Sequence, residues 1–169
     1  MRVAVLSDTH APRRWHGCPS AVAAVLEHCE LILHAGDVCT AQVLTELAQW
    51  APVHAVLGNN DGPDVRDWGA PETLELVVAG LPVAMIHDSG PATGRAARLR
   101  RRFPDAGLVI FGHSHIPWDE RVPWDKSADG QRFFNPGSPT DRRRQPRGTM
   151  GLLDVRDGEL VSCQLVAVT

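Results

Sequence analysis

Apolar residues occur in short runs along this chain, and five of the runs stop at a polar residue of a type that binds metals. The runs are rich in Val, Ile and Leu and short, which predicts buried strands rather than helices. They cover residues 3–6, 31–33, 53–57, 83–86 and 108–111. Loops at strand carboxyl ends converge on one crevice in open α/β sheets, so we expect the polar residues after these runs to meet.

Helical patterns separate the first three runs. Ser20 is a suitable N-cap for a helix over residues 21–26, and Thr40 is one for a second helix with an apolar face over residues 43–47. Strand and helix therefore alternate in the first part of the chain. This alternation predicts parallel strands covered by helices.

The second half of the chain has a different pattern. Two strand-like runs flank Gly80-Leu81-Pro82, and Asp157-Gly158 separates two further runs, which is a strong hairpin signal. A helix is expected over residues 93–102, before the run at 108–111. The whole pattern predicts an α/β fold of the α+β kind, in which a two-sheet mixed β-sandwich is flanked by helices.

Composition narrows the class of protein. At 169 residues, with 43% hydrophobic and 22% charged residues, the chain is expected to form one globular domain over residues 1–169. The net charge of -3 gives no general attraction to nucleic acid or anionic membranes. No apolar stretch approaches the roughly 20 residues that span a bilayer, and the N-terminal run is too short for a signal peptide. We therefore expect a cytoplasmic protein with no membrane partner.

Cysteine and arginine add two smaller expectations. The four cysteines have no C-x-x-C spacing, which favours buried free thiols over disulfides or a zinc site. Arginines cluster at residues 98–102 and 142–147. We interpret the first cluster as the solvated face of a helix and the second as a basic loop, although a phosphate substrate would suit the second.

Seven side chains that follow the strand-like runs form a mixed oxygen and nitrogen ligand set: Asp8, His10, Asp37, Asn59, His87, His113 and His115. Seven ligands exceed what one first-row metal needs, so we expect two ions that share one carboxylate. The i, i+2 spacing of two of the pairs would point both side chains the same way along an extended segment. This donor set favours two divalent transition-metal ions, Mn²⁺ first and Fe, Ni, Co or Zn as alternatives, over Mg²⁺.

The same residues carry a resemblance to a known family. Asp8-Thr9-His10, Gly36-Asp37, residues 58–61, His87 and residues 112–115 resemble, in order and spacing, the sequence blocks of the calcineurin-like metallophosphoesterases. Asn135-Pro136-Gly137-Ser138 is similar to the block that follows in the small, capless bacterial and archaeal phosphodiesterase branch. The resemblance covers residues 8 to 138 and implies the family fold, a two-sheet β-sandwich flanked by helices in four layers.

The resemblance also implies a role for each residue. Three groups are expected: Asp8, His10 and His115 at the first metal, Asn59, His87 and His113 at the second, and Asp37 as the bridge. Asp61 would fix the Asn59 loop or a neighbouring histidine, and the turn at residues 135–138 would shape the floor of the site. Among the other histidines, His34 is expected to make an outer hydrogen bond, whereas His16, His28 and His54 are interpreted as structural.

The chain departs from the family pattern in three places. Many members have a histidine just after the ligand asparagine, where it assists the leaving group, and this chain has Asn60 there. Asp88 follows His87 where glycine is frequent, which adds negative charge near the site. The segment 116–134 carries Trp118 and Trp124 and is longer than a tight hairpin requires. Packing, an oligomer contact and a wall of the substrate cleft stay open as roles for these tryptophans.

Together these features predict a dinuclear metal-dependent phosphoesterase that attacks small phosphoesters with a hydroxide held between the metals, a phosphodiesterase before a monoesterase. Asn60 and Asp61 are the expected catalytic residues beyond the ligands, Asn60 by donating a hydrogen bond to developing charge. A phosphomonoesterase or a nuclease at the same site, and a non-catalytic metal-binding scaffold for protein interaction, are the alternatives. The acidic net charge does not favour nucleic acid, and a homo-oligomer stays open.

Overall fold

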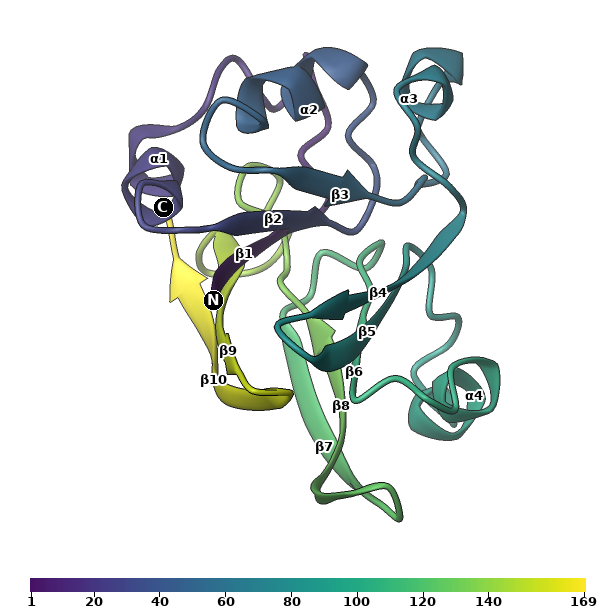
Figure 1. Ribbon diagram of the computed structural model, residues 1–169. Coiled ribbons are helices and arrows are strands. Elements are labelled where there is room, and N and C mark those ends of the chain that lie inside the picture. The colour runs from purple at the N-terminus through teal and green to yellow at the C-terminus, as the bar shows by residue number, and fades with distance from the viewer.

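Two mixed five-stranded sheets make up the centre of the molecule (Figure 1). The computed structural model describes residues 1–169, apart from the side chains of residues 128 and 129. The first sheet has the order β10-β9-β1-β2-β3 and consists of β1 (Arg2–Leu6), β2 (Leu31–His34), β3 (Val53–Ala55), β9 (Thr149–Arg156) and β10 (Glu159–Ala167). The second has the order β4-β5-β6-β8-β7 and consists of β4 (Thr73–Val78), β5 (Leu81–Ile86), β6 (Leu108–Ile110), β7 (Trp118–Trp124) and β8 (Ser127–Asn135).

The strands that precede the candidate ligands are parallel within each sheet. β2 runs parallel to β1 and β3, and Ile32 pairs with Val53. β6 runs parallel to β5 and β8, and Leu108 pairs with Val83. The strands β4, β7, β9 and β10 complete the sheets in antiparallel pairs. Both sheets are therefore mixed, as the change of pattern along the chain predicts.

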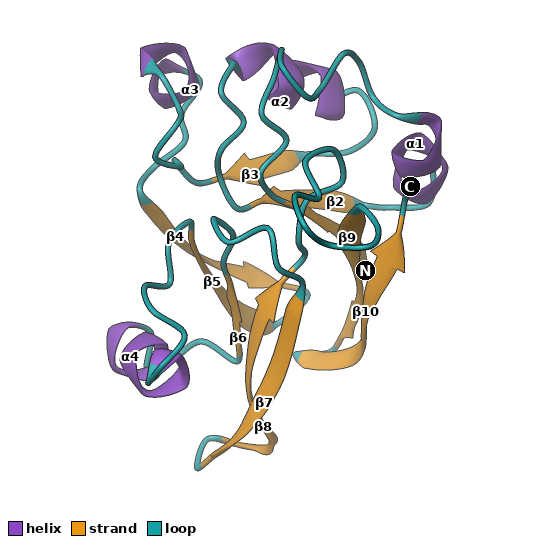
Figure 2. Ribbon diagram, turned by 180° about the vertical axis from the view of Figure 1, so that it is seen from behind, coloured by secondary structure: helices purple, strands orange, loops and turns teal.

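Helices cover the outer faces of the two sheets and complete a four-layer arrangement. α1 (Ser20–Leu26), α2 (Ala41–Leu47) and α3 (Pro63–Asp67) share one apolar cluster with the first sheet. α4 (Arg95–Arg102) shares another with the second sheet. Figure 2 shows α4 on the opposite side of the molecule from α1 and α2. The predicted two-sheet sandwich flanked by helices is confirmed.

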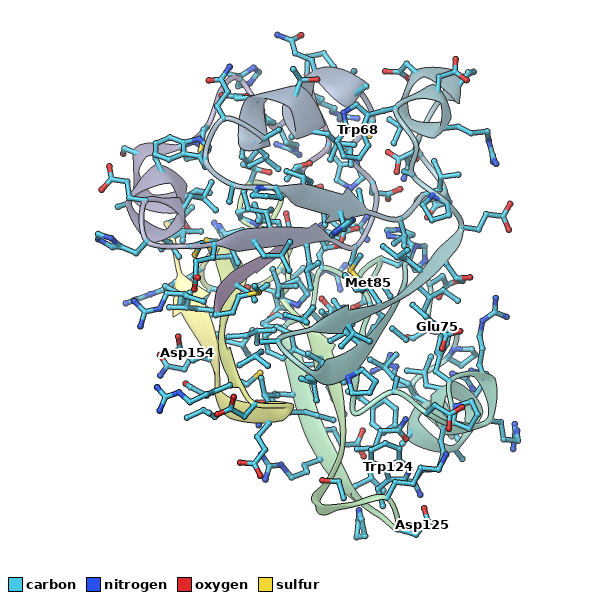
Figure 3. All side chains as sticks on the ribbon, viewed as in Figure 1. Trp68, Glu75, Met85, Trp124, Asp125 and Asp154 are labelled. Atoms are coloured by element: carbon cyan, nitrogen blue, oxygen red, sulfur yellow. The ribbon has the colours of Figure 1, made fainter. Side chains whose placement is uncertain are left out.

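Alternating side chains of β1 connect three of these layers. Ala4 and Leu6 point into the cluster with the helices, whereas Val3 and Val5 point into the interior between the sheets. Met85 enters the same interior from the second sheet (Figure 3). Successive residues of a strand face opposite sides, and both sides of β1 are covered. For this reason β1 appears in the sequence as a continuous apolar run rather than an alternating one.

The starts of α1 and α4 differ from the prediction. The N-cap of α1 is Pro19, whose carbonyl accepts the first helical hydrogen bond from Ala23 (2.9 Å), so the prediction of Ser20 is wrong. Thr40 is the N-cap of α2 as predicted, although its side chain makes no capping bond. α4 begins at Arg95 rather than at residue 93. α3 was not predicted, because its five residues are too short to show a helical period.

Three hairpins occur in the described chain. β9 and β10 meet at Asp157-Gly158, as predicted, and both residues have the left-handed φ of a tight hairpin turn (52° and 83°). β4 and β5 meet at Ala79-Gly80, one residue earlier than the predicted turn. β7 and β8 form a long hairpin in which Trp118 lies opposite Asn135. Segment 116–134 is therefore long because it forms nearly all of both strands of this hairpin.

The two tryptophans of β7 have different surroundings. The guanidinium of Arg95 lies over the ring of Trp118, 5.4 Å from its centroid. Trp124 lines a cavity of about 360 Å³ toward the far end of the hairpin (Figure 3). Neither tryptophan lines the cleft of about 430 Å³ that borders His10. These positions favour packing roles over a wall of the substrate cleft.

The arginines of α4 fasten neighbouring segments to the helix. Arg98 donates to the carbonyl of Ser89 from Nε (2.9 Å) and from Nη2 (2.7 Å). Arg100 donates from Nη2 to the carbonyl of Pro123 (2.7 Å). The prediction of a merely solvated face is wrong for these two residues.

The four cysteines are free, as predicted. Only Cys29 is buried, and Cys18, Cys39 and Cys163 are partly exposed, so the predicted burial holds for one of them. Among the described residues, no helix is both long enough and apolar enough to span a membrane.

Candidate metal centre

Loops at the carboxyl ends of five strands bring all seven predicted ligands together. The residues are Asp8 and His10 after β1, Asp37 after β2, Asn59 after β3, His87 after β5, and His113 and His115 after β6. Two groups of three have ligand atoms within 4.8 Å of one another and could each hold a metal ion: Asp8, His10 and His115, and Asp37, His87 and His113. The first group is the set that the family resemblance implies for the first metal.

Asp8, His10 and His115 converge on one point. Nε2 of His115 lies 3.3 Å from Oδ1 of Asp8 and 3.2 Å from Nε2 of His10. Nδ1 of His115 donates to the backbone carbonyl of Asp141 at 2.5 Å, so Nε2 of the neutral ring carries a lone pair. The rings of His10 and His115 stack with centroids 5.1 Å apart.

Asn59, His87 and His113 form the second group. The amide oxygen of Asn59 lies 2.8 Å from Nδ1 of His113 and 3.1 Å from Nε2 of His87. Nδ1 of His87 donates to the carbonyl of Ala35 (2.7 Å), so Nε2 of the neutral ring carries a lone pair and no proton. That nitrogen therefore faces the oxygens of Asn59 and Asp37, and these lone pairs repel unless a proton or a cation lies between them.

Asp37 lies between the two groups. Its Oδ2 is 3.7 Å from Nε2 of His10 and 3.4 Å from Nε2 of His87. Asn60 donates to both oxygens of this carboxylate, from its backbone N–H to Oδ1 (2.8 Å) and from Nδ2 to Oδ2 (2.7 Å). One carboxylate thus reaches a histidine of each group, which is the position that a bridging ligand needs.

The donor set fits divalent cations. Oδ2 of Asp8 accepts from the hydroxyl of Ser7 (2.7 Å) and from the N–H of His113 (3.0 Å). Oδ1 of Asp8 is buried and is one of two buried side-chain polar atoms among the described residues without a hydrogen-bond partner. Leaving a carboxylate oxygen unpaired is costly, and a cation would satisfy it. Carboxylate, imidazole and amide donors together suit transition metals.

Burial and neighbouring charges shift the pKa values of the carboxylates and histidines in the two groups. Burial raises the pKa of Asp8 to about 7 and holds the pKa values of His10 and His115 below the ordinary histidine value. Burial alone would lower the pKa of His87, but its hydrogen bond to Asp37 and the charges of Asp8 and Asp37 raise it. Burial alone would raise the pKa of Asp37, but His87 and Asn60 hold it well below its usual range. The negative charges that raise the pKa of His87 would likewise favour a cation beside it.

Backbone turns, rather than extended segments, aim most of these side chains. Five of the seven candidate ligands have a left-handed φ: Asp8 (57°), His10 (50°), Asp37 (57°), His113 (69°) and His115 (58°). Such φ values are uncommon outside glycine and cluster at functional sites, where the surrounding structure enforces them. The prediction that the i, i+2 pairs lie on extended segments is therefore wrong, although the paired side chains do converge.

Two glycines allow the loops to touch. A Cβ on Gly58 would lie 2.2 Å from both the backbone N and Oδ1 of Asp37. A Cβ on Gly112 would lie 1.9 Å from the hydroxyl of Ser7 and 3.0 Å from Oδ2 of Asp8. Each glycine directly precedes a candidate ligand, so a side chain there would push one ligand loop away from the next.

Asp61 joins two of the ligand loops. Its Oδ2 accepts from the backbone N–H groups of Gly58 (2.7 Å) and Asp37 (3.0 Å). Its Oδ1 accepts from the N–H of Cys39 (2.6 Å). The carboxylate lies behind the ligands and holds the loops that follow β2 and β3 at a fixed separation.

The turn at residues 135–138 fastens the remaining loops. Nδ2 of Asn135 donates to the carbonyl of Gly112 (2.8 Å), and Oγ of Ser138 donates to the carbonyl of Asp8 (2.8 Å). The carbonyl of Asp141, which orients His115, was not predicted. No sequence pattern could indicate it, because the group that acts is a backbone carbonyl and every residue type has one.

His34 makes hydrogen bonds beside the candidate ligands, as expected, but its partners are Gly36 and Thr9 rather than a ligand. Its Nδ1 accepts from the N–H of Gly36 (3.2 Å), so Nε2 carries the proton and donates to Oγ1 of Thr9 (3.2 Å). Burial lowers the pKa of His34 to about 3. His16, His28 and His54 are exposed and lie outside the centre.

Two clefts border the centre. One of about 430 Å³ is lined by His10, Arg13, Arg14, Asn60, Asp141 and Arg143. The other, of about 300 Å³, includes Asn59, His87 and Asp88 in its lining. A larger cavity of about 580 Å³ beside α2 includes none of the candidate ligands in its lining, so size does not locate the site.

Arg13 and Arg14 in the first cleft were not predicted, because the sequence shows them only as two charges in a loop.

Comparison with known proteins identifies the family. Residues 1–158 match the model of the calcineurin-like phosphoesterase superfamily domain. The chain is 34% identical over 170 residues to a probable metallophosphoesterase of Methanothermobacter thermautotrophicus, covering 98% of this chain and 92% of that protein. It is 31% identical over 155 residues to a probable metallophosphoesterase of Methanocaldococcus jannaschii, covering 90% and 75% of the two. The chain therefore belongs to the calcineurin-like metallophosphoesterases, and the predicted resemblance is confirmed.

Solved structures agree with this fold. Vps29 of Entamoeba histolytica complexed with Zn²⁺ matches with a TM-score of 0.76 and 25% identity over the full length of both chains. The structure of an archaeal phosphodiesterase matches with a TM-score of 0.71 and 21% identity, covering 98% of this chain and 100% of that one. The second likeness supports the fold alone.

Proposed function

We propose that this protein is a dinuclear metal-dependent phosphodiesterase that hydrolyses small phosphodiesters. The observation that supports two ions best is the position of Asp37, whose Oδ2 lies 3.7 Å from Nε2 of His10 and 3.4 Å from Nε2 of His87. A carboxylate that reaches both groups of candidate ligands would help to hold an ion in each, as in two-metal hydrolases.

The ligands would divide between the two ions in a defined way. One ion would be held by Asp8, His10 and His115, the other by Asn59, His87 and His113, and Asp37 would be shared. When bound, the ions supply Lewis acidity that activates water and stabilises charge on the phosphoryl group. The chain fixes the tautomers of two histidines, because the carbonyls of Ala35 and Asp141 accept hydrogen bonds from Nδ1–H of His87 and His115. We propose Mn²⁺ first, with Fe, Ni, Co or Zn as alternatives.

Asn60 favours particular leaving groups in this proposal. Its amide donates to Asp37 and could donate to charge that develops on the substrate, but it cannot supply a proton to a leaving alkoxide. Diesters whose leaving groups are stable anions would therefore react best. Monoesters carry a second negative charge, which would lie close to the ligand carboxylates and to Asp88 in the neighbouring cleft.

A second candidate is a non-catalytic scaffold that binds metal and another protein. The observation in its favour is the 25% identity to Vps29, which a related structure names as a vacuolar protein sorting protein. What supports the enzyme over the scaffold is that two clefts, which a small substrate could enter, open beside the candidate ligands.

The test is turnover by metal-free protein refilled separately with Mn²⁺, Ni²⁺, Zn²⁺ and Mg²⁺. The substrates are bis(4-nitrophenyl) phosphate, 4-nitrophenyl phosphate and a single-stranded oligonucleotide. Hydrolysis of the diester supports the proposal. Metal binding without turnover of any ester supports the scaffold, and salt-sensitive cleavage of the oligonucleotide as the main activity supports a nuclease.

A further inference from the structure

The cleft on the His10 side of the metal centre is lined largely by arginine. Arg13, Arg14 and Arg143 contribute three guanidinium groups, and Asp141 contributes the one carboxylate. His10 and Asn60 complete the lining, so the cleft opens directly onto the candidate ligands. This cleft therefore offers a place for the next chemical group of a substrate held at the metal centre, and it is the one of the two bordering clefts with three arginines in its lining.

The single carboxylate of the cleft already has partners. Oδ1 of Asp141 lies 3.6 Å from Nε of Arg14, and its Oδ2 lies 3.7 Å from Nδ1 of His115. The guanidinium groups of Arg13 and Arg143 make no ion pair or hydrogen bond with the residues that the structure describes. Two positive side chains therefore face the cleft without an acidic partner of their own.

The two arginines come from distant parts of the chain. Arg13 lies in the loop after β1, and Arg143 lies in the loop between β8 and β9. Arg143 also has a left-handed φ of 48°, which is unusual for a long side chain. Two loops that meet only in the folded protein thus present like charges to one cleft, and an anion bound there would be attracted to both of them.

We propose that Arg13 and Arg143 form a subsite for a second phosphate group of the substrate, beside the phosphodiester that is hydrolysed. The proposal rests on the proposed phosphodiesterase function and names its substrate class: small phosphodiesters that carry a further phosphate, such as a nucleotide ester with a phosphate on its sugar. Guanidinium groups match phosphate oxygens in geometry and stay charged at any working pH, which suits this role.

A pair of substrates that differ in one phosphate tests the subsite. They are thymidine 5′-(4-nitrophenyl phosphate) and the same ester with a 3′-phosphate, each hydrolysed by the Mn²⁺-loaded protein. We expect the 3′-phosphate to lower KM about tenfold, which corresponds to about 1.4 kcal/mol, while kcat changes little. Equilibrium binding of thymidine 3′,5′-bisphosphate and thymidine 5′-monophosphate, measured by calorimetry, should show a similar preference independently of turnover.

The variants assign the effect to the two side chains. Arg13→Ala/Arg143→Ala should abolish the preference for the 3′-phosphate in KM and in binding. Arg144→Ala is the matched control, because Arg144 is an exposed neighbour in the same loop that does not line the cleft, and it should keep the preference. Arg14 is left unchanged because it pairs with Asp141, whose carbonyl orients His115.

The outcomes separate this inference from the proposed function. Hydrolysis of both esters with equal KM and equal binding of the two nucleotides would overturn the subsite and leave the phosphodiesterase intact. Absence of turnover, with the bisphosphate still bound preferentially through Arg13 and Arg143, would support the subsite and overturn the activity. An oligothymidylate cleaved with higher kcat/KM than the 3′-phosphorylated ester would overturn the small-substrate class. A preference that Arg144→Ala removes as fully as the double variant would overturn the assignment to these two residues.

Discussion

Oδ2 of Asp37 lies 3.4 Å from Nε2 of His87. The other ring nitrogen of His87, Nδ1, donates a hydrogen bond to the carbonyl of Ala35. The same oxygen of Asp37 lies 3.7 Å from Nε2 of His10 in the other group. Two rings that belong to different groups of candidate ligands therefore meet at one carboxylate. This relationship makes Asp37 the residue on which the two-ion proposal depends most.

Replacement of Asp37 should affect both ions. If Asp37 is shared as proposed, Asp37→Ala would remove one ligand from each ion and leave the two positive ions less shielded from each other, whereas Asn59→Ala would remove a ligand from one ion. We expect Asp37→Ala to lose more bound metal and more diesterase activity than Asn59→Ala. Elemental analysis of the two variants, with circular dichroism as the control for folding, measures this. Equal metal stoichiometry in the wild type and Asp37→Ala would show that the bridge is misassigned.

Metal removal should abolish activity. In the proposed mechanism the bound ions activate the attacking water, so chelation would remove the nucleophile as well as the cations that offset the carboxylates. We expect no hydrolysis of bis(4-nitrophenyl) phosphate after chelation, and better recovery with Mn²⁺ or another transition metal than with Mg²⁺, because nitrogen donors suit transition metals. Full activity of the metal-free protein would refute the mechanism.

Asn60 should make the rate depend on the leaving group. A positioned general acid typically contributes about 10²–10⁴-fold, and asparagine cannot act as one. Aryl and cyclic diesters should therefore be hydrolysed faster than alkyl diesters, and monoesters should be poorer. Asn60→His should help alkyl leaving groups more than aryl ones, as measured by kcat/KM across a series of leaving-group pKa values. Alkyl monoesters hydrolysed as fast as aryl diesters by the wild type would rule out this role for Asn60.

Asp61 should matter for stability and for metal affinity together. Its carboxylate accepts three backbone N–H groups, so Asp61→Asn leaves at least one of them facing a donor. We expect a loss of about 1–3 kcal/mol in the free energy of unfolding and a roughly 10–100-fold loss in metal affinity. Urea titration and metal titration measure the two effects.

Asp64→Asn is the matched control for Asp61→Asn. Asp64 accepts one N–H, from Ala41 at 2.8 Å, at an exposed position. The control should be milder in stability and neutral in metal affinity. Equal metal affinity in Asp61→Asn and the wild type would show that Asp61 does not position the ligand loops.

His34 should make the metal-free protein less stable in acid. Burial lowers its pKa to about 3, below the ordinary histidine value of 6.5, so between these pH values the unfolded chain binds a proton that the folded chain does not. Stability should therefore fall as the pH decreases from 6.5 toward 3, by up to about 1.4 kcal/mol per pH unit from this residue.

Unfolding in urea between pH 4 and pH 7 measures the contribution of His34. His34→Gln should be less stable at neutral pH but should show a shallower dependence on pH than the wild type. His54→Gln, at an exposed position of β3, should leave the dependence unchanged. An identical slope in His34→Gln and the wild type would mean that His34 is protonated equally in both states.

The sequence by itself determined which residue types stand at the strand ends. Short apolar runs must be buried, and the polar residue that stops each run is left at the rim of the sheet, so Asp8, Asp37 and His113 could be placed from pattern alone. The family blocks implied a division of the ligands between two ions, which stays a prediction. The short helix α3 could not be found in this way, because five residues give no period and its position depends on the packing of Val65 against the first sheet.

Only the tertiary structure decided how these residues are aimed and what surrounds them. The left-handed turns at Asp8 and His115 are held by contacts between loops that lie far apart in the chain, and no local preference of Asp or His predicts them. The carbonyl that orients His115 belongs to Asp141, and a backbone group leaves no trace in the residue pattern. Arg13 and Arg143 likewise share one cleft because two distant loops meet there, and local periodicity carries no information about such long-range contacts.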